Sequence, residues 1–278
     1  MRRLVLIMAA TALALVTVAM ITGCGSSSSA DSSAGSGSST SAGPAKLTVF
    51  AAASLTKVFP QIAADFQKTH AGAQFAFDFA GTDTLTAQIE QGAPADVFAG
   101  ASSKYGVELS SKGLIDTPQP FATNRLVVIV PAANPAHIAS LGDLAKPGVK
   151  LVIGDPTVPI GTYTRTVLAN LDATLGAGYS VKVLKNVVSN ALQVTSVVSS
   201  VELGEADAGF VYVTDARSAG DKVGRIALPA AAQATATYPI AAVKDSTNAA
   251  LAQQFVMFVL GADAQALLKQ AGFGPPPK

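Results

Sequence analysis

The stretch Val49 to Phe66, VFAAASLTKVFPQIAADF, decides the fold class because it joins a strand to a helix through small residues. An apolar strand ending runs into three alanines, and apolar side chains then recur at the spacing of a helix. We therefore expect a strand over 46–51 and a helix over 55–68, with Ser54 at the start of the helix.

Two interpretations of Ser54 follow from this position. A serine at a helix start most often caps the helix, because its side-chain oxygen accepts a hydrogen bond from an otherwise unpaired backbone N–H group. The alternative is an anion site, since free N–H groups and the positive end of the helix dipole attract an oxyanion. The small residues before Ser54 would let such a ligand approach the backbone.

The alternation of strand-like and helical runs continues along the chain and indicates parallel βαβ units. Further strands are expected at 74–79, 97–99, 125–130, 151–154, 181–184, 208–212, 226–228 and 238–243. The predicted fold is α/β, with two lobes, each a doubly wound sheet, joined by a two-strand hinge. Lobe I is expected to hold 46–124 and 239–278, and lobe II 125–238. Ligands of such sheets bind beside helix N-termini, so a cleft between the lobes is the expected site.

The N-terminal part of the chain indicates export. Arg2 and Arg3 precede an apolar run that ends in small residues, so residues 1–23 are typical of a secretory signal. Cys24, the single cysteine, ends a segment that resembles a bacterial lipobox and would become a lipid anchor. Residues 24–45 are rich in serine and glycine and predict a flexible tether. We expect a lipid-anchored protein on the extracytoplasmic side of the membrane.

Composition excludes several function classes. Without Arg2 and Arg3, the 19 basic residues become 17 against 18 acidic ones, and no basic cluster suggests nucleic acid. One cysteine excludes a disulfide framework and a thiolate metal cluster. The sequence contains no nucleophile elbow, Walker loop or zinc motif, so we expect no enzyme and no metal cofactor.

Two other junctions resemble the one at Ser54. Thr82 follows a short glycine turn after a strand, and the loop over 152–163 holds hydroxyls and two prolines before a helix. Neither Ser54 nor Thr82 has Glu or Gln three residues later, so no reciprocal capping box would occupy the local N–H groups.

Four motifs in this order resemble the molybdate-binding proteins of bacterial ABC importers. They are AAASLTKVF (51–59), QIEQGAPADVFAGAS (88–102), GDPTVPIGTY (154–163) and GEADAGFVYVTDA (204–216). The similarity covers nearly all of 46–278. It implies a two-lobed periplasmic-binding-protein fold of type II that closes on a tetrahedral oxyanion and delivers it to a membrane permease.

The resemblance also implies a set of site residues. Ser54 corresponds to a serine that offers its hydroxyl and backbone N–H, and Thr82 to a second hydroxyl. Ile160 and Val194 correspond to backbone N–H donors, and Tyr212 to a tyrosine whose hydroxyl closes the pocket. The position of Val194 rests on counting back from the fourth motif.

Such a set suits an ionised dianion, which carries no proton and needs only donors. The expected ligand is molybdate or tungstate, and the alternative is another tetrahedral oxyanion such as phosphate or sulfate. No further cofactor is expected. The expected partners are the ABC permease and its ATPase, and the protein itself is expected to be a monomer.

Three side chains leave alternatives open. Asp83 either points to solvent, where it complements the helix dipole, or faces the pocket, where it would accept the proton of phosphate. Tyr212 could instead be a strand-end tyrosine with its hydroxyl at the surface. Asp215 is expected to belong to turn or helix-end structure, with a role at the hinge or the permease surface as the alternative.

Overall fold

The structure is a computed structural model that describes residues 45–277. The predicted signal segment 1–23, Cys24 and, apart from Ala45, the predicted tether 24–45 lie outside the described residues. The part of the chain that the structure describes is built on two five-stranded sheets with helices around them.

The first sheet has the strand order β2-β1-β3-β10-β4. Strand β1 pairs in parallel with β2 and β3, whereas β10 runs antiparallel to β3 and β4. The strands are β1 (Lys46–Ala52), β2 (Gln74–Ala80), β3 (Val97–Ala99), β4 (Gln119–Asn124) and β10 (Ala236–Ala242). The last four residues of β1 are buried, so this end of the strand lies inside the protein.

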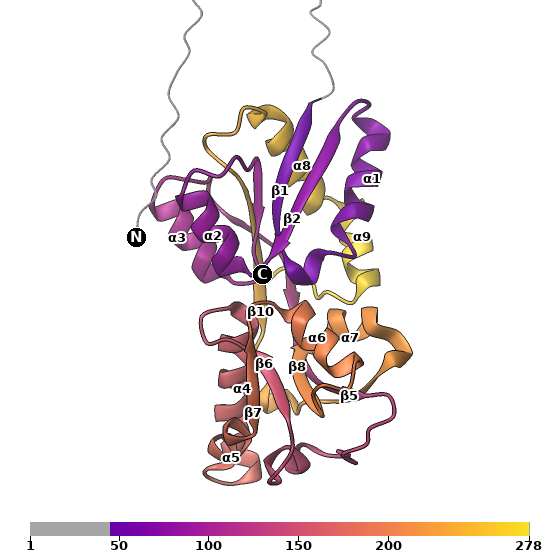
Figure 1. The fold of residues 1–278 in the computed structure, drawn as a ribbon. Coiled ribbons are helices and arrows are strands. Elements are labelled where there is room, and N and C mark those ends of the chain that lie inside the picture. Colours follow the sequence, from indigo (N-terminus) through magenta and orange to yellow (C-terminus); the bar gives the residue numbers. More distant parts are fainter. Residues whose placement is uncertain (1–44, 278) are drawn as a thin grey trace, which may run out of the picture. The chain divides into compact units, whose positions relative to one another are not determined.

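Helices cover both faces of the first sheet (Figure 1). Figure 1 shows α2 (Thr82–Glu90) and α3 (Ser103–Ser111) on one side, with α1 (Phe59–Thr69), α8 (Ala249–Leu260) and α9 (Ala262–Ala271) on the other. Phenylalanine rings pack edge to face between α1 and α8, with 6.3 Å between the ring centroids of Phe59 and Phe255 and 5.4 Å between those of Phe66 and Phe255. Such aromatic pairs stabilise a core beyond the area they bury. We call this sheet with its helices lobe I.

No single helix between residues 45 and 277 has the length and apolar character of a membrane span. Helices α8 and α9 reach the length and apolar character of a membrane span only when they are taken together, and the pair is bent by 59°. In α8, Ala252, Phe255 and Val259 are buried in the protein core.

The second sheet has the strand order β7-β6-β8-β5-β9. Strand β6 pairs in parallel with β7 and β8, and β5 runs antiparallel to β8 and β9. The strands are β5 (Leu126–Pro131), β6 (Leu151–Gly154), β7 (Val187–Ala191), β8 (Ala208–Tyr212) and β9 (Val223–Ile226). Strands β5, β6 and β8 are buried along their whole length, which fits sheet strands covered on both faces.

Helices also surround the second sheet, and we call the two together lobe II. In Figure 1, α4 (Pro159–Leu175) and α5 (Tyr179–Lys185) lie on one side, and α6 (Val194–Glu202) and α7 (Val213–Ala219) on the other. Short 3-10 turns complete the chain: η1 (Ala53–Leu55) in lobe I, and η2 (Leu141–Ala145), η3 (Gly220–Lys222) and η4 (Ala230–Ala232) in lobe II.

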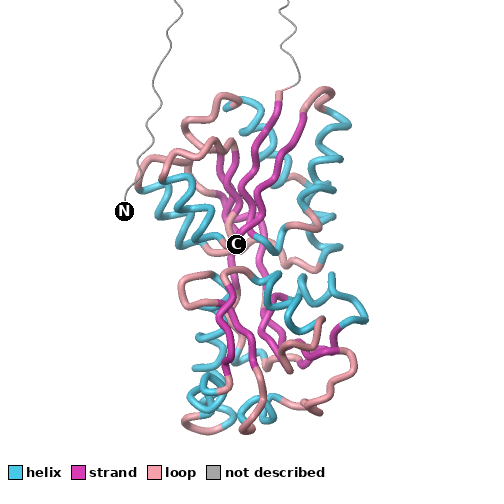
Figure 2. Tube along the Cα trace, in the orientation of Figure 1, coloured by secondary structure: helices cyan, strands magenta, loops and turns pink. Residues whose placement is uncertain are grey.

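The chain passes twice between the lobes (Figure 2). The first passage joins β4 to β5 at Arg125, and the second leads from β9 to β10. Strand β10 belongs to the first sheet from Ala236 onward, with a register shift between Tyr238 and Pro239. The predicted α/β fold of two sheets joined by two crossing segments is confirmed.

One predicted strand is wrong. Residues 181–184 lie in helix α5, where Tyr179 and Val183 are buried one helical turn apart while the side chain of Val181 is 55% exposed. The strand follows instead as β7. A short apolar run fits both periods, so its pattern alone does not separate a strand from a helix.

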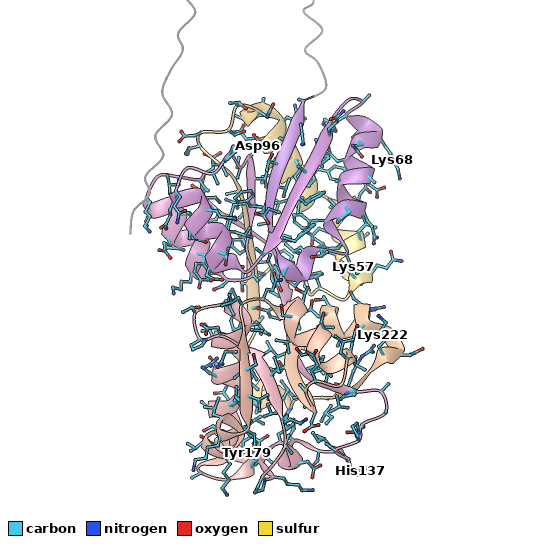
Figure 3. The ribbon with its side chains drawn as sticks, in the orientation of Figure 1. Lys57, Lys68, Asp96, His137, Tyr179 and Lys222 are labelled. Atoms are coloured by element: carbon cyan, nitrogen blue, oxygen red, sulfur yellow. The ribbon has the colours of Figure 1, made fainter. Side chains whose placement is uncertain are left out.

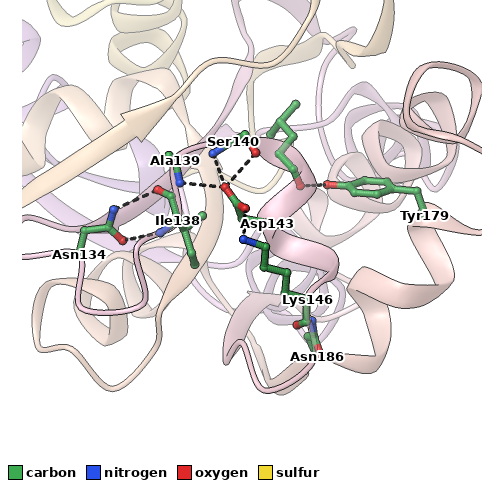
Figure 4. A network of polar contacts seen from close by, with 9 residues as sticks. Asn134, Ile138, Ala139, Ser140, Asp143, Lys146, Tyr179 and Asn186 are labelled. Atoms are coloured by element: carbon green, nitrogen blue, oxygen red, sulfur yellow. Dashed lines mark hydrogen bonds and ion pairs between the residues drawn. The ribbon is translucent and has the colours of Figure 1, made fainter.

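The loop between β5 and β6 is held by local polar contacts at the far end of lobe II (Figure 4). The carboxylate of Asp143 accepts hydrogen bonds from the backbone N–H and the hydroxyl of Ser140, and its other oxygen lies 2.6 Å from the Lys146 ammonium nitrogen. Lys146 and the Ser140 bonds hold the pKa of Asp143 well below its usual range. The Tyr179 hydroxyl donates to the Leu141 carbonyl at 2.6 Å and ties α5 to this loop.

Candidate anion-binding site

A small cavity of about 240 Å³, counting its opening, lies between the two lobes. Its walls come from strand-to-helix turns of both lobes. Its wall residues are Ala52, Ala53, Ser54, Ala80, Gly81, Thr82 and Ala101 from lobe I, and Val158, Pro159, Ile160, Gln193, Val194 and Tyr212 from lobe II.

Four helical N-termini meet at this cavity. They belong to the 3-10 turn η1 and to the helices α2, α4 and α6, and the residue before each one lines the cavity: Ala52, Gly81, Val158 and Gln193. Among residues 45–277, no side chain caps any of these four starts. The first N–H groups of a helix have no partner inside it, and the dipole places partial positive charge there. The wall therefore offers backbone donors to an anion.

Two glycines bring the start of α4 to the cavity. A Cβ atom on Gly161 would lie 1.8 Å from the carbonyl oxygen of Asp155, and one on Gly154 would lie 2.5 Å from the Gly161 nitrogen. The first turn of α4 can thus pack against the end of β6 only because neither residue has a side chain. Pro159 at the first helical position suits this start, and Ile160 follows it in the cavity wall.

Lobe I contributes two buried hydroxyls whose oxygens already have protein partners. The Thr82 oxygen accepts the Ala101 backbone N–H at 3.1 Å, and the Ser54 oxygen lies 2.9 Å from the Tyr238 hydroxyl. Thr82 is 1% exposed and Ser54 8%. The Thr82 hydrogen remains available to a ligand, because a hydroxyl that accepts one bond can still donate another.

Lobe II contributes the hydroxyl of Tyr212 at the end of β8. Tyr212 is 2% exposed, and its hydroxyl has no hydrogen-bond partner among the described residues. Burial raises the pKa of Tyr212 well above its usual value, so the phenol keeps its proton and remains a donor. The alternative of a surface hydroxyl is wrong. A buried polar atom without a partner costs free energy unless a ligand supplies one.

The structure brings the five predicted site residues into one wall. Ser54, Thr82, Ile160, Val194 and Tyr212 all line the cavity. The capping role considered for Ser54 is wrong, because Ser54 lies inside η1, whose N-cap is Ala52. The α-helix starts later than predicted, at Phe59, since the alanines and the serine form a separate 3-10 turn. Whether these residues hold an anion stays a prediction.

Asp83 is partly buried and does not line the cavity. One of its carboxylate oxygens is buried without a hydrogen-bond partner among the described residues. This oxygen and the Leu192 carbonyl of lobe II both lie close to Gly81, at 2.6 and 2.5 Å from the position its Cβ would take. The carboxylate therefore sits where the lobes meet, beside the cavity.

A second contact also joins the lobes near the cavity. The hydroxyl of Tyr105 in α3 donates a hydrogen bond to the carbonyl of Thr157, in the loop before α4. Burial raises the pKa of Tyr105, with a further contribution from the charge of Asp83. Tyr105 and Asp83 thus mark one edge of the boundary between the lobes.

Sequence reasoning missed several residues of the site. Gln193 lines the cavity and lies outside the four motifs, and Ala101 lines it from within the second motif without having been predicted as a site residue. Tyr238 and Asn124 stand behind Ser54, although Tyr238 is 184 residues away from it along the chain. Asn124 ends the strand segment QPFATN and Tyr238 lies within ATYPIAA, and neither segment reveals that these two residues contact each other.

The cavity wall is uncharged, whereas a neighbouring cavity is not. None of the residues from 45 to 277 that line the first cavity carries a charge. The second cavity shares Ser54 with the first and includes Lys57, Glu202, Asp215 and Lys222. Figure 3 shows Lys57 in lobe I and Lys222 in lobe II on the same side of the molecule. The Lys222 ammonium lies 3.3 Å from the Glu202 carboxylate.

Asp215 lines the second cavity and contacts the backbone of Tyr212, which lines the first. Its carboxylate accepts the backbone N–H of Tyr212 at 3.2 Å, at the start of α7. This contact agrees with the expected helix-end role. Burial raises the pKa of Asp215 to about 7. The group can therefore change its charge near neutral pH beside the end of β8.

Metal ligands do not gather in the part of the chain that the structure describes. No three His, Cys, Asp or Glu side chains there are placed to hold a metal ion. The chemistry of the described site consists of neutral N–H and O–H donors.

Known proteins are similar to this chain in sequence and in fold. Residues 47–274 match the family described as bacterial extracellular solute-binding protein. The molybdate-binding protein ModA of Mycobacterium tuberculosis is 41% identical over 235 residues, which cover 84% of this chain and 86% of that protein. ModA of Haemophilus influenzae is 34% identical over 242 residues, covering 84% of this chain and 91% of that protein.

A solved structure agrees with these relatives. The periplasmic molybdate-binding protein of Azotobacter vinelandii superposes with a TM-score of 0.72 at 26% identity, over 83% of this chain and all of that one. The matching residues span both sheets and the cavity between them. The chain belongs to the family of bacterial extracellular solute-binding proteins that includes the molybdate-binding proteins ModA.

Proposed function

We propose that this protein binds molybdate, and also tungstate, in the cavity between its lobes and delivers the anion to an ABC importer. One observation carries the proposal: in the part of the chain that the structure describes, four helical starts without a side-chain cap and the unpaired Tyr212 hydroxyl meet in a wall without charge. The similarity to ModA proteins over most of the chain supports the same ligand.

The donor set explains the choice of a fully ionised oxyanion. Molybdate accepts hydrogen bonds at all four oxygens, and the wall offers N–H and O–H donors. Hydrogen bonds to a charged partner contribute about 1.5 to 3 kcal/mol each. Several of them in one enclosed cavity can offset the hydration that the dianion loses. Ser54, Thr82 and Tyr212 would give hydroxyl hydrogens, while Ile160 and Val194 would give backbone N–H groups.

Binding would depend on closure of the lobes, because each supplies part of the donor set. A ligand that contacts both lobes stabilises the closed arrangement and shifts the population toward it. The two passages of the chain between the sheets are the natural place for the motion. The closed protein would then present both lobes to the permease, whose ATPase drives import.

Another tetrahedral oxyanion is the second candidate. Sulfate is also an acceptor-only dianion, and only the size of the cavity would separate it from molybdate. Phosphate has less support than the sequence allowed, because the Asp83 carboxylate does not line the cavity.

A calorimetric titration tests the proposal directly. The purified protein is titrated with molybdate, tungstate, sulfate and phosphate under one set of conditions. We expect one anion per protein and tight binding of molybdate and tungstate only, with the anion recovered unchanged because no reaction is proposed. Preference for sulfate or phosphate would overturn the molybdate assignment but keep the solute-binding function.

We further propose that the protein works as a monomer held at the outer face of the membrane by a lipid on Cys24. The family is extracellular, and the lipobox-like segment before Cys24 supports the anchor. Replacing Cys24 by alanine should move the protein from the membrane fraction to the soluble extracytoplasmic fraction. An unchanged distribution would contradict the anchor.

A further inference from the structure

A chain of buried hydrogen bonds runs from the cavity to the crossing point between the lobes. The Ser54 oxygen lies 2.9 Å from the Tyr238 hydroxyl, and the Asn124 side-chain nitrogen donates to that hydroxyl at 3.4 Å. The same nitrogen donates to the Thr214 hydroxyl of lobe II at 2.8 Å. Tyr238 is fully buried and Asn124 is 3% exposed, so water does not replace these partners.

The orientation of the Asn124 amide is fixed by the backbone. The N–H of Arg125 donates to the Asn124 side-chain oxygen at 2.9 Å, and a backbone N–H can bond only to the oxygen of the amide. The amide nitrogen therefore faces Tyr238 and Thr214. Its two hydrogens serve these two hydroxyl oxygens.

The fixed amide also sets the direction of the next bond. The Tyr238 oxygen accepts from Asn124, and the Ser54 oxygen lies within hydrogen-bond distance of the Tyr238 hydroxyl, at 2.9 Å, as an acceptor for its hydrogen. Burial raises the pKa of Tyr238, so the phenol keeps that hydrogen. Tyr238 thus donates to Ser54, and the Ser54 hydrogen is left for an acceptor in the cavity.

The Thr82 hydroxyl is also fixed as a donor toward the cavity, by a different hydrogen bond. Its oxygen accepts the Ala101 backbone N–H, which cannot reverse its direction. Both lobe I hydroxyls therefore present a hydrogen to the cavity. Within the described part of the chain, the Tyr212 hydroxyl has no hydrogen-bond partner, so its hydrogen is also free for a ligand.

We propose that Tyr238 and Asn124 are positioning residues that determine specificity by fixing Ser54 as a donor toward the anion. An oxyanion that carries its own proton, such as hydrogen phosphate, would place a donor hydrogen against cavity groups that are themselves donors. The unfavourable contact between the two hydrogens lowers the affinity for this anion. Such a repulsive contact discriminates between anions more strongly than the loss of one attractive contact would. The inference rests on the proposed function, because it concerns how the same cavity selects its ligand.

The test compares molybdate with phosphate at a mildly alkaline pH, where both anions carry two negative charges. In Tyr238→Phe the aromatic ring stays, but Ser54 loses its donor and its hydroxyl can turn to accept a proton. We expect the ratio of molybdate to phosphate affinity to fall at least about tenfold, as for one lost charge-assisted hydrogen bond. Tyr179→Phe is the matched control, because it removes a buried tyrosine hydrogen bond far from the cavity (Figure 4). Its ratio should equal that of the unmodified protein.

Asn124→Asp tests the direction of the chain of bonds. The new carboxylate would accept a hydrogen bond where the amide donated one, so the Tyr238 hydroxyl would donate to it. Ser54 would then donate to the Tyr238 oxygen, and the lone pairs of Ser54 would face the cavity. The added charge lowers the affinity for both dianions alike, whereas the reversed hydroxyl acts on their ratio. We expect the ratio to fall further than in Tyr238→Phe.

The outcomes separate this inference from the proposed function. If the unmodified protein does not bind molybdate, the proposed function fails before any variant is compared. If it binds molybdate and folded Tyr238→Phe keeps the original ratio, Tyr238 does not set the polarity of Ser54 and the inference is overturned. Should Tyr238→Phe fail to fold, the ratio measured for Asn124→Asp decides, and an unchanged ratio there overturns the inference as well.

Discussion

The two halves of the cavity differ in how completely the protein satisfies its own donors and acceptors. In lobe I, the oxygens of Ser54 and Thr82 are both hydrogen-bonded to protein groups. In lobe II, the Tyr212 hydroxyl is buried without a partner among the described residues, whereas helical starts without a side-chain cap among these residues occur in both lobes. The hydroxyl oxygens of lobe I are therefore already held by protein hydrogen bonds. The Tyr212 hydroxyl of lobe II lacks an acceptor that an anion would supply. Substitutions in the two halves should separate binding from stability in different ways.

The largest effect is expected in lobe II from Gly161→Ala. The new Cβ would lie 1.8 Å from the Asp155 carbonyl oxygen, so the start of α4 and the N–H of Ile160 must move. We expect molybdate affinity to fall more than about a hundredfold and the free energy of unfolding to fall by about 1 to 3 kcal/mol. Calorimetry and urea unfolding measure the two changes. Gly142→Ala is the control, because its Cβ would meet nothing closer than 3.6 Å.

The next effect compares one hydroxyl from each half. Ser54→Ala and Tyr212→Phe should each weaken molybdate binding by about ten- to a hundredfold, the range for one hydrogen bond to a charged ligand. Ser54→Ala should also lower the free energy of unfolding by about 1 to 3 kcal/mol, because the buried Tyr238 hydroxyl loses its acceptor. Tyr212→Phe should leave it unchanged or higher, since that hydroxyl has no protein partner among the described residues. Equal losses of stability in both variants would contradict the difference between the two halves of the cavity. Unchanged molybdate affinities would contradict the assignment of Ser54 and Tyr212 to the binding site.

A third prediction concerns pH and the lobe II side of the cavity. Burial raises the pKa of Asp215 from 3.8 to about 7, so the folded protein holds this proton more firmly than the unfolded chain does. The stability that Asp215 contributes is present at acidic pH, decreases as the pH rises from about 4 to about 7, and is lost above that range. Asp215→Asn should flatten this dependence and raise the melting temperature at alkaline pH. A dependence that is equally steep in the variant would show that another group causes it.

The smallest effect is expected from Asp83→Asn at the lobe boundary. The buried carboxylate oxygen and the Leu192 carbonyl are both acceptors, whereas an amide could donate across the boundary. We expect molybdate affinity to rise by no more than about fivefold, with an unchanged ratio to phosphate affinity. A selective loss of phosphate binding would mean that the carboxylate reaches the anion after all.

The alternation of elements was readable from the sequence because long buried runs carry a clear period. β6 and β8 follow their predicted ranges, while β7 and β4 were missed. β7 is a sheet-edge strand with exposed side chains, and β4 contains a proline, so neither shows the apolar pattern of a central strand.

The wall of the site was more accessible to sequence reasoning than its support. Ser54, Thr82 and Val194 stand at strand-to-helix junctions, which leave a local signal in the chain. Tyr238 contacts Ser54 and Asn124, which lie 184 and 114 residues away from it along the chain. No local pattern encodes contacts of such a separation. The same holds for Asp83, because its surroundings come from the other lobe.

The placement of the tyrosines has an optical consequence. The protein has no tryptophan and five tyrosines, and Tyr105, Tyr212 and Tyr238 all lie where the lobes meet. Its near-ultraviolet absorption and circular dichroism therefore come largely from chromophores at the boundary where the proposed closure would take place. The unlabelled protein carries its own spectroscopic reporter of ligand capture, and stopped-flow measurements can follow closure without an introduced dye.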